Sequence, residues 1–352
     1  MHSECVPFFC LIMLFARFCF SLIAMLLCYA HGVYAQSWRP DILGGNYEQK
    51  EILLPDDYSG KVKAVAVRQK LSIASDKAVL YVHGYNDYFF QYELGNNFAN
   101  NGYNFYAVDL RKYGRSLMVG QTPFEVRDIK EYFEDINAVL DIILSEGNKS
   151  VVLMGHSTGG LIASYYLAVE DTRKYPITAL ILNSPFLDMN LDAVTEDFVL
   201  PVVSLCGAIF PSVTISQGGG NQYARTLLKK YGGEWDYNTQ WKFEWPQSVS
   251  FGWLAAITRA QDILHQGADI AVPILLLHSD KSAIEGTATD EEASNADIVL
   301  DVAEISCYGR RIGDDVTEYV VKNGMHDLFL SRIPVRYSLY SHVFEWLRER
   351  SL

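Results

Sequence analysis

Residues 150–160 read Ser-Val-Val-Leu-Met-Gly-His-Ser-Thr-Gly-Gly, an apolar run that ends in a Gly-x-Ser-x-Gly motif centred on Ser157. The run predicts a buried strand and the following residues predict a helix, so Ser157 is expected at the turn between them. In such a turn the serine hydroxyl is exposed, and the glycines at 155 and 159 let the strand and the helix approach each other. This context is typical of a nucleophilic serine.

Six short apolar segments have the pattern of buried parallel strands. They are Ala78–His83, Phe105–Asp109, Ser150–Met154, Ala179–Leu182, Ile274–His278 and Val316–Val321. Amphipathic helices separate them. The clearest is expected to begin at Pro123, inside a capping box of Thr122 and Glu125, and to end before Gly147. This alternation predicts an α/β fold with a mostly parallel central sheet and helices on both faces.

Residues 188–262 interrupt the alternation and are rich in aromatic side chains, among them Trp241 and Trp245. We interpret them as an inserted helical lid, with the catalytic core formed by residues 36–187 and 263–352. One hypothesis is that the aromatic side chains supply an apolar pocket for the substrate. The alternative is that most of them form the lid's own core.

Residues 1–35 differ in character from the rest of the chain. A dense apolar run over 18–30 follows Arg17 and precedes Val33-Tyr34-Ala35. Small residues at 33 and 35 fit a signal-peptidase site, so we predict a signal peptide cleaved before Gln36 and an exported, secreted or periplasmic protein. The alternative is an N-terminal membrane anchor, because residues 8–30 are long enough to span a bilayer.

The net charge of −13 and the lack of a basic stripe argue against nucleic acid as a partner. The sequence has no metal-ligand cluster, phosphate loop or dinucleotide fingerprint, so we expect neither a metal nor a cofactor. Nothing in it indicates an obligate protein partner. Beyond the leader only Cys206 and Cys307 remain, and two buried thiols are favoured over a disulfide.

A nucleophilic serine requires two oxyanion donors and a general base. The N–H of Thr158 follows the nucleophile directly. The second donor is expected in the loop after strand 78–83, where the N–H of Tyr85 is the candidate. His326 is predicted to be the base because it follows the last predicted strand. The other histidines after the nucleophile, at 265, 278 and 342, fall in predicted helices or at the end of a packed strand.

Four segments together resemble the monoacylglycerol lipase/lysophospholipase-like (serine aminopeptidase-type) branch of the α/β-hydrolase superfamily. They are His83-Gly84, residues 108–116, residues 155–160 and Gly324-Met-His-Asp327. Residues 108–116 resemble the family's D-x-R-G-x-G-x-S loop, except that Lys112 replaces the first glycine. That loop is structural in the family, so Asp109 is not expected to be catalytic. The resemblance implies an α/β-hydrolase fold with a cap between the sixth and seventh strands.

The resemblance also implies a catalytic acid shortly after strand 274–278. Asp280 is the first candidate, but family members usually carry the acid two residues later, where this chain has Ser282. The run that begins at Asp297 fits the family pattern of an acid, a few apolar residues and a helix. We therefore predict Asp297 as the acid, with 281–296 as an insertion before it. Asp280 and Asp301 are the alternatives.

These residues predict a serine hydrolase that cleaves esters of lipophilic substrates, of monoacylglycerol or lysophospholipid type, through Ser157, Asp297 and His326. An alternative is an aminopeptidase or amidase on the same scaffold, which would use lid carboxylates to pair with a substrate ammonium. The carboxylates available for this are Glu196, Asp197, Glu234, Asp236 and Glu244. A non-enzymatic binding protein is a third hypothesis, disfavoured because packing alone does not require a serine, a histidine and an acid together.

Overall fold

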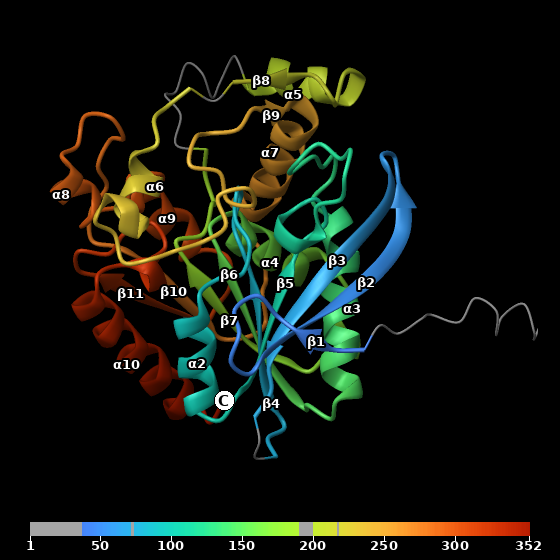
Figure 1. Cartoon of the computed structure of the whole chain (residues 1–352), viewed down its shortest axis with the longest axis vertical. Coiled ribbons are helices and arrows are strands. Elements are labelled where there is room, and N and C mark those ends of the chain that lie inside the picture. Colours follow the sequence, from blue (N-terminus) through green and yellow to red (C-terminus); the bar gives the residue numbers. More distant parts are fainter. Residues whose placement is uncertain (1–36, 72–73, 190–199, 217) are drawn as a thin grey trace, which may run out of the picture. The chain divides into compact units, whose positions relative to one another are not determined.

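A nine-stranded sheet organises the computed structural model, which describes residues 37–71, 74–189, 200–216 and 218–352 (Figure 1). The predicted leader and residues 190–199 of the predicted lid lie outside this description. The strands are β1 (Arg39–Pro40), β2 (Tyr47–Asp57), β3 (Gly60–Gln69), β4 (Lys77–Val82), β5 (Asn104–Asp109), β6 (Ser150–His156), β7 (Ile177–Asn183), β10 (Ile274–Ser279) and β11 (Val316–Val321). Their order across the sheet is β1-β2-β3-β5-β4-β6-β7-β10-β11. The pairs β1–β2, β2–β3 and β3–β5 are antiparallel. All pairs from β5 onward to β11 are parallel.

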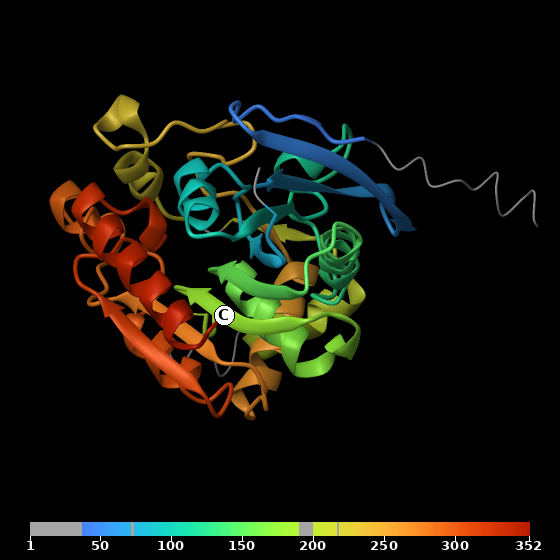
Figure 2. The same cartoon turned by 90° about the horizontal axis from the view of Figure 1, so that it is seen from below.

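Helices cover both faces of this sheet (Figures 1 and 2). One face packs against α2 (Tyr92–Asn100) and α10 (Ile333–Glu349), and the other against α3 (Glu131–Ser145), α4 (Thr158–Val169), α7 (Phe251–His265) and α9 (Val302–Gly309). Within β4, Val79 and Tyr81 pack in the hydrophobic core on the side of α2 and α10, whereas Leu80 packs in the core on the opposite side. Successive side chains point to opposite faces of a strand, so a strand buried on both sides must be apolar throughout. The predicted fold class is confirmed.

The helix expected to begin at Pro123 begins instead at Glu131. Phe124 adopts a φ of 64°, which no α-helix contains, and breaks the chain direction there. The Glu131 side chain accepts hydrogen bonds from the N–H groups of Arg127 and Asp128, at 2.9 and 3.0 Å. The capping signal at Thr122 was therefore misleading. The predicted end is right, since α3 stops at Ser145 and Gly147 has a φ of 91°.

The segment between β7 and β10 contains short elements that lead back to the core. They are α5 (Leu200–Ile209), β8 (Thr214–Ile215), α6 (Gln222–Leu227), a 3-10 turn at Lys229–Tyr231, β9 (Val249–Ser250) and α7. α5 packs closely on α7, because a Cβ on Gly207 would lie 2.4 Å from the Phe251 carbonyl oxygen. The remaining short elements are α8 (Asp290–Ala293) and 3-10 turns at Gly114–Ser116, Thr172–Lys174 and Leu328–Leu330.

Two further properties concern the same described residues. None of their helices has the length and apolar character needed to cross a membrane. Cys206 and Cys307 are both free thiols, which agrees with the preference for unpaired cysteines. The expectation that both are buried is wrong, because Cys206 is half-buried and Cys307 is exposed.

Candidate active site

Ser157 occupies a strained turn between β6 and α4, with φ 53° and ψ −121°. Few non-glycine residues adopt such a conformation, and it persists only where the surroundings enforce it. Here the enforcing contacts are close backbone approaches. A Cβ on Gly155 would lie 2.4 Å from the Gly159 carbonyl oxygen, and a Cβ on Gly159 would lie 2.3 Å from that of His83. Glycine at both positions is therefore a steric requirement of the turn.

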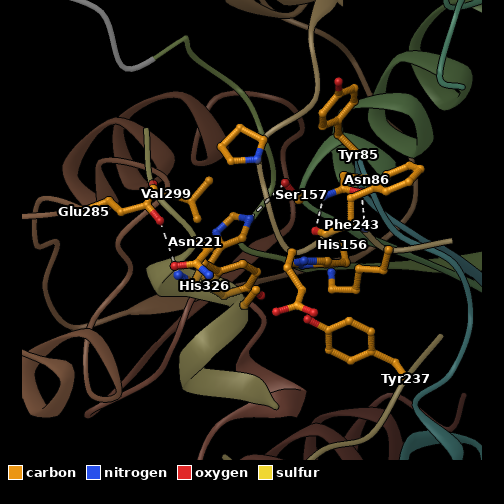
Figure 3. A pocket seen from close by; sticks show the side chains of 16 residues that line it. Tyr85, Asn86, His156, Ser157, Asn221, Tyr237, Phe243, Glu285, Val299 and His326 are labelled. Carbon is orange, nitrogen blue, oxygen red and sulfur yellow. Dashed lines mark hydrogen bonds between the residues drawn. The ribbon is translucent and has the colours of Figure 1, made fainter. Parts of the chain in front are cut away.

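Three residues predicted from the sequence meet at this turn, and Figure 3 shows two of them, Ser157 and His326. His326 Nε2 lies 3.0 Å from Ser157 Oγ, and His326 Nδ1 lies 2.9 Å from Asp297 Oδ2. All three side chains are buried. A carboxylate can only accept, so it assigns the proton to Nδ1 and leaves Nε2 free to accept the proton of the serine hydroxyl.

The Asp297 carboxylate is itself held in place. Its Oδ1 accepts hydrogen bonds from the N–H groups of Val299 and Leu300, both at 2.8 Å. The two alternative acids are engaged elsewhere. Asp280 is exposed and accepts from the N–H of Asn323 at 2.8 Å. Asp301 accepts from the N–H of Ala303 as the N-cap of α9.

Both expected oxyanion donors lie on backbone next to Ser157. Thr158 is the first residue of α4, where helical N–H groups have no partner within the helix. On the other side, a Cβ on Gly84 would lie 3.0 Å from Ser157 Cβ, so the backbone that leads into Tyr85 passes directly against the nucleophile. Tyr85 and Ser157 line the same pocket.

Two further histidines surround the site as buried, neutral groups. His83 Nε2 accepts from the N–H of Leu110 at 3.1 Å, and its Nδ1 lies 2.7 Å from the Gly84 carbonyl oxygen. This arrangement matches a role in shaping the loop. The ring of His156 lies 4.9 Å from that of His326. Burial lowers the pKa of both His83 and His156, so neither places a second cation beside His326 near neutral pH.

A cavity of about 180 Å³ opens beside Ser157. Its apolar walls are formed by Tyr85, Tyr223, Tyr237, Phe243, Pro246 and Val299, and its polar groups by Asn86, Asn221, Lys242, Glu244 and Glu285. Phe243 and Tyr237 come from the predicted lid. Trp241 and Trp245, expected in an acyl pocket, are not among the lining residues. Trp241 packs against the Tyr88 ring at 5.2 Å, and Trp245 is 60% exposed.

A buried polar cluster behind the pocket was missed in the sequence. Ligand-type atoms of Asp87, His156 and Asp327 lie within 4.8 Å of one another. Lys242 Nζ lies 3.1 Å from Asp87 Oδ1, and Gln91 donates to Asp327. Because the Lys242 ammonium already provides a positive charge beside Asp87, and Asp327 accepts from Gln91, the two carboxylates have partners and the cluster is a poor cation site. Its members are up to 240 residues apart, and no local motif connects them.

Comparisons with known proteins agree with this geometry. The sequence profile of the family described as Hydrolase_4 (serine aminopeptidase, S33) matches residues 74–331, well over half of the chain. The α/β-hydrolase superfamily protein YisY of Bacillus subtilis is 33% identical over 101 residues, which are 28% of this chain and 35% of that protein. A probable lysophospholipase L2 of Haemophilus influenzae is 26% identical over 117 residues, or 33% of this chain and 36% of that protein. The chain thus spans about a third of the length of these relatives.

Solved structures extend the likeness across the fold. A monoglyceride lipase from Saccharomyces cerevisiae, solved as a soluble variant with a substrate analogue, has a TM-score of 0.62 at 17% identity. The match covers 91% of this chain and 97% of that one. A monoacylglycerol lipase from Paleococcus ferrophilus has a TM-score of 0.58 at 18% identity, covering 80% and 97% of the two chains. Such low identities establish the fold alone.

Fold and site together define an α/β-hydrolase with a serine at its strand-to-helix turn. The match over residues 74–331 shows that the chain belongs to the Hydrolase_4 (serine aminopeptidase, S33) family. The resemblance inferred from four short segments of sequence is thereby confirmed.

Proposed function

We propose that this protein hydrolyses carboxylic esters of lipophilic substrates, of monoacylglycerol or lysophospholipid type, through an acyl-enzyme on Ser157. The observation that carries the proposal is the hydrogen-bonded series from Ser157 through His326 to Asp297, at 3.0 and 2.9 Å, beside an open pocket. A nucleophile bonded to a base, which is bonded in turn to an acid, is the arrangement that activates a serine hydroxyl.

In the first half of the reaction Ser157 Oγ attacks the ester carbonyl carbon while His326 Nε2 accepts its proton. Negative charge develops on the carbonyl oxygen, and the N–H groups of Thr158 and Tyr85 stabilise it. Asp297 stabilises the imidazolium and keeps the ring in the productive tautomer. The tetrahedral species then collapses, the alcohol leaves with the proton from His326, and the acyl group remains on Ser157.

In the second half a water molecule takes the place of the alcohol. His326 Nε2 accepts a proton from the water as its oxygen attacks the acyl carbon. The same two N–H groups stabilise the second tetrahedral species. Its collapse returns the proton to Ser157 Oγ and releases the carboxylic acid, so the enzyme is regenerated without metal or cofactor.

The composition of the pocket supports an amphiphilic ester. Tyr85, Tyr223, Phe243 and Val299 offer apolar surface for an acyl chain, while Asn86 and Asn221 offer hydrogen bonds for a polar alcohol portion. The names of the relatives, a probable lysophospholipase and two monoglyceride lipases, support the same substrate type. A monoacylglycerol carries no charge, so apolar contact must supply most of the affinity for a substrate of that type.

An aminopeptidase or amidase activity is the second candidate, because the family takes its name from serine aminopeptidases and two carboxylates line the pocket. Both carboxylates already have partners. Glu244 binds Lys230 and Tyr231, and Glu285 accepts from the N–H groups of Gln222 and Tyr223. Of the other candidates, Glu234 binds Arg336 and Asp236 binds Lys229, while Glu196 and Asp197 lie outside the described residues. Because the described carboxylates already have partners, they are poorly placed to bind a substrate ammonium, which favours ester hydrolysis over the aminopeptidase activity.

A parallel screen of p-nitrophenyl esters from acetate to palmitate and of aminoacyl p-nitroanilides distinguishes the two activities. The proposal predicts turnover of the esters, with kcat/KM highest at an intermediate or long acyl chain, and little turnover of the anilides. Monoacylglycerol and lysophospholipid are then assayed by release of fatty acid. Hydrolysis of the anilides alone would replace the proposal with the aminopeptidase.

A further inference from the structure

The loop that carries Tyr85 is fastened to the lid by the side chain of the next residue. Asn86 Oδ1 accepts from the N–H of Phe243 at 2.8 Å, and Asn86 Nδ2 donates to the carbonyl oxygen of Phe243 at 2.9 Å (Figure 3). A single amide side chain thus satisfies both backbone groups of one lid residue. We refer to this pair of hydrogen bonds as the Asn86 clamp.

Two neighbouring contacts reinforce the clamp on the same side. Asp87 and Lys242 form a buried ion pair at 3.1 Å. The hydroxyl of Tyr88 accepts from the N–H of Asn238 at 2.8 Å. Three consecutive residues of the loop therefore hold residues 238–243, and the lid is fixed to the core at this edge of the pocket.

The clamp also determines the path of the loop. Asn86 has a φ of 48°, a left-handed conformation that asparagine tolerates better than most residues. One residue before Tyr85, Gly84 lies against Ser157, and one residue after it, Asn86 is held by the lid. Gly84 has no side chain to restrict its own rotation. The hydrogen bonds of Asn86, together with the packing of the Tyr85 ring against Phe124 and Trp253, therefore limit how the N–H of Tyr85 is aimed.

We propose that Asn86 is a positioning residue, which fastens the oxyanion loop to the lid and so aims the N–H of Tyr85 at the reacting oxygen. This inference rests on the proposed function, in which Tyr85 supplies one oxyanion donor. It adds that the backbone of the lid, at Phe243, helps to build the oxyanion hole although it does not touch the reacting atoms. The alignment of a donor with the oxyanion matters most in the transition state, so its loss should lower kcat more than it raises KM.

The test compares Asn86→Gly with Asn323→Gly. Both asparagines are left-handed, with φ of 48° and 58°, so glycine preserves the backbone at each position and removes only the side chain. For Asn86→Gly we expect kcat to fall about 10- to 100-fold, which is less than the loss of a whole oxyanion donor, with KM nearly unchanged. Asn323→Gly should retain the kcat of the wild type.

An alkylboronic acid supplies a readout that a purely structural role would not change. It forms a tetrahedral adduct on Ser157 and places an oxygen in the oxyanion hole. We expect its Ki to rise in Asn86→Gly by about the factor lost in kcat, while a fatty alcohol of equal length, which forms no adduct, binds as in the wild type. Asn86→Asp keeps the acceptor for the N–H of Phe243 and loses the donor to its carbonyl oxygen. Its kcat should therefore lie between those of the wild type and Asn86→Gly.

Several outcomes would overturn the inference. Wild-type kcat and boronate Ki in Asn86→Gly would do so, as would an equal loss in Asn323→Gly or a loss fully explained by a lower folded fraction. If Asn86→Gly does not fold, the same kinetic and boronate measurements on Asn86→Asp decide the question. A wild-type protein that neither turns over esters nor binds the boronate would instead contradict the proposed function itself.

Discussion

Asp297 pairs with Ser282 across a single β-bridge just beyond the end of β10. The N–H of Ala283 donates to the carbonyl oxygen of Asp297 at 2.8 Å, and the N–H of Asp297 donates to that of Lys281 at 3.0 Å. Residues 283–296 therefore leave the core and return to the point where they left it. The excursion brings Asp297 beside the position, two residues after Asp280, where the sequence resemblance led us to expect an acid.

This geometry predicts opposite results for two aspartates close in sequence. Asp297→Asn should lower kcat by roughly ten-thousandfold, because an amide no longer enforces the tautomer in which His326 Nε2 accepts a proton. Asp280→Asn should have little effect, since its carboxylate is exposed and bonded to Asn323. Steady-state ester hydrolysis by the two variants decides between them, and the reverse pattern would assign the acid to Asp280.

The buried ion pair between the lid and the loop predicts a large effect on stability. Lys242→Met leaves the Asp87 carboxylate buried without a cation, and we expect the free energy of unfolding to fall by about 3–5 kcal/mol. Lys230→Met provides the matched control, because the Lys230–Glu244 pair is more exposed, is screened by solvent and should contribute far less. Urea denaturation measures both. Equal losses of unfolding free energy in the two variants would mean that the buried Lys242–Asp87 pair stabilises the fold no more than the exposed pair does.

Lys112 stands where the family loop has glycine, and it keeps the left-handed backbone with a φ of 64°. Its ammonium lies 2.8 Å from Asp57 Oδ2 and above the Tyr58 ring. Lys112→Ala should lose the ion pair and keep the strain, whereas Lys112→Gly should lose the ion pair and relieve the strain. We therefore expect the glycine variant to be more stable by about 1 kcal/mol. A comparison of their unfolding free energies tests this, and an alanine variant at least as stable would show that the strain is negligible.

The predicted signal peptide has its own test. Because Val33 and Ala35 fit the signal-peptidase pattern, we expect the exported protein to begin at Gln36. Amino-terminal sequencing of the protein purified from its native host measures this directly. Recovery of residues 18–30 in the membrane fraction would favour the alternative of an anchor.

The parts of the fold that could be predicted are those with continuous apolar runs. β11 has the predicted bounds, and the other five predicted strands differ by only a few residues at each end. β2 was missed because charged residues such as Glu48, Lys50 and Glu51 interrupt its hydrophobic pattern. β3 was missed although its residues 64–67 are apolar and buried. The start of α3 was misplaced because a local capping pattern cannot reveal the left-handed turn at Phe124.

Some residues of the candidate site could also be predicted from local sequence, and others could not. Ser157 and His326 follow predicted strands, so local sequence was enough to propose them, whereas Asp297 required the resemblance to a family. The contacts of the lid could not be foreseen. Asn86 and Phe243 are 157 residues apart and have no motif in common, and Trp241 packs on Tyr88 although its aromatic character suggested a pocket. Tertiary packing alone determines which side chains of residues 188–262 face the pocket.

The Ser157→Ala variant tests whether Ser157 is the nucleophile of the proposed ester hydrolase. The measurement is p-nitrophenyl ester turnover together with labelling by a fluorophosphonate probe, on wild-type and variant proteins of equal thermal stability. We expect the wild type to hydrolyse the ester and take up the label, and the variant to lose turnover by about a millionfold and remain unlabelled. Turnover or labelling of Ser157→Ala at the wild-type level would show that Ser157 is not the nucleophile.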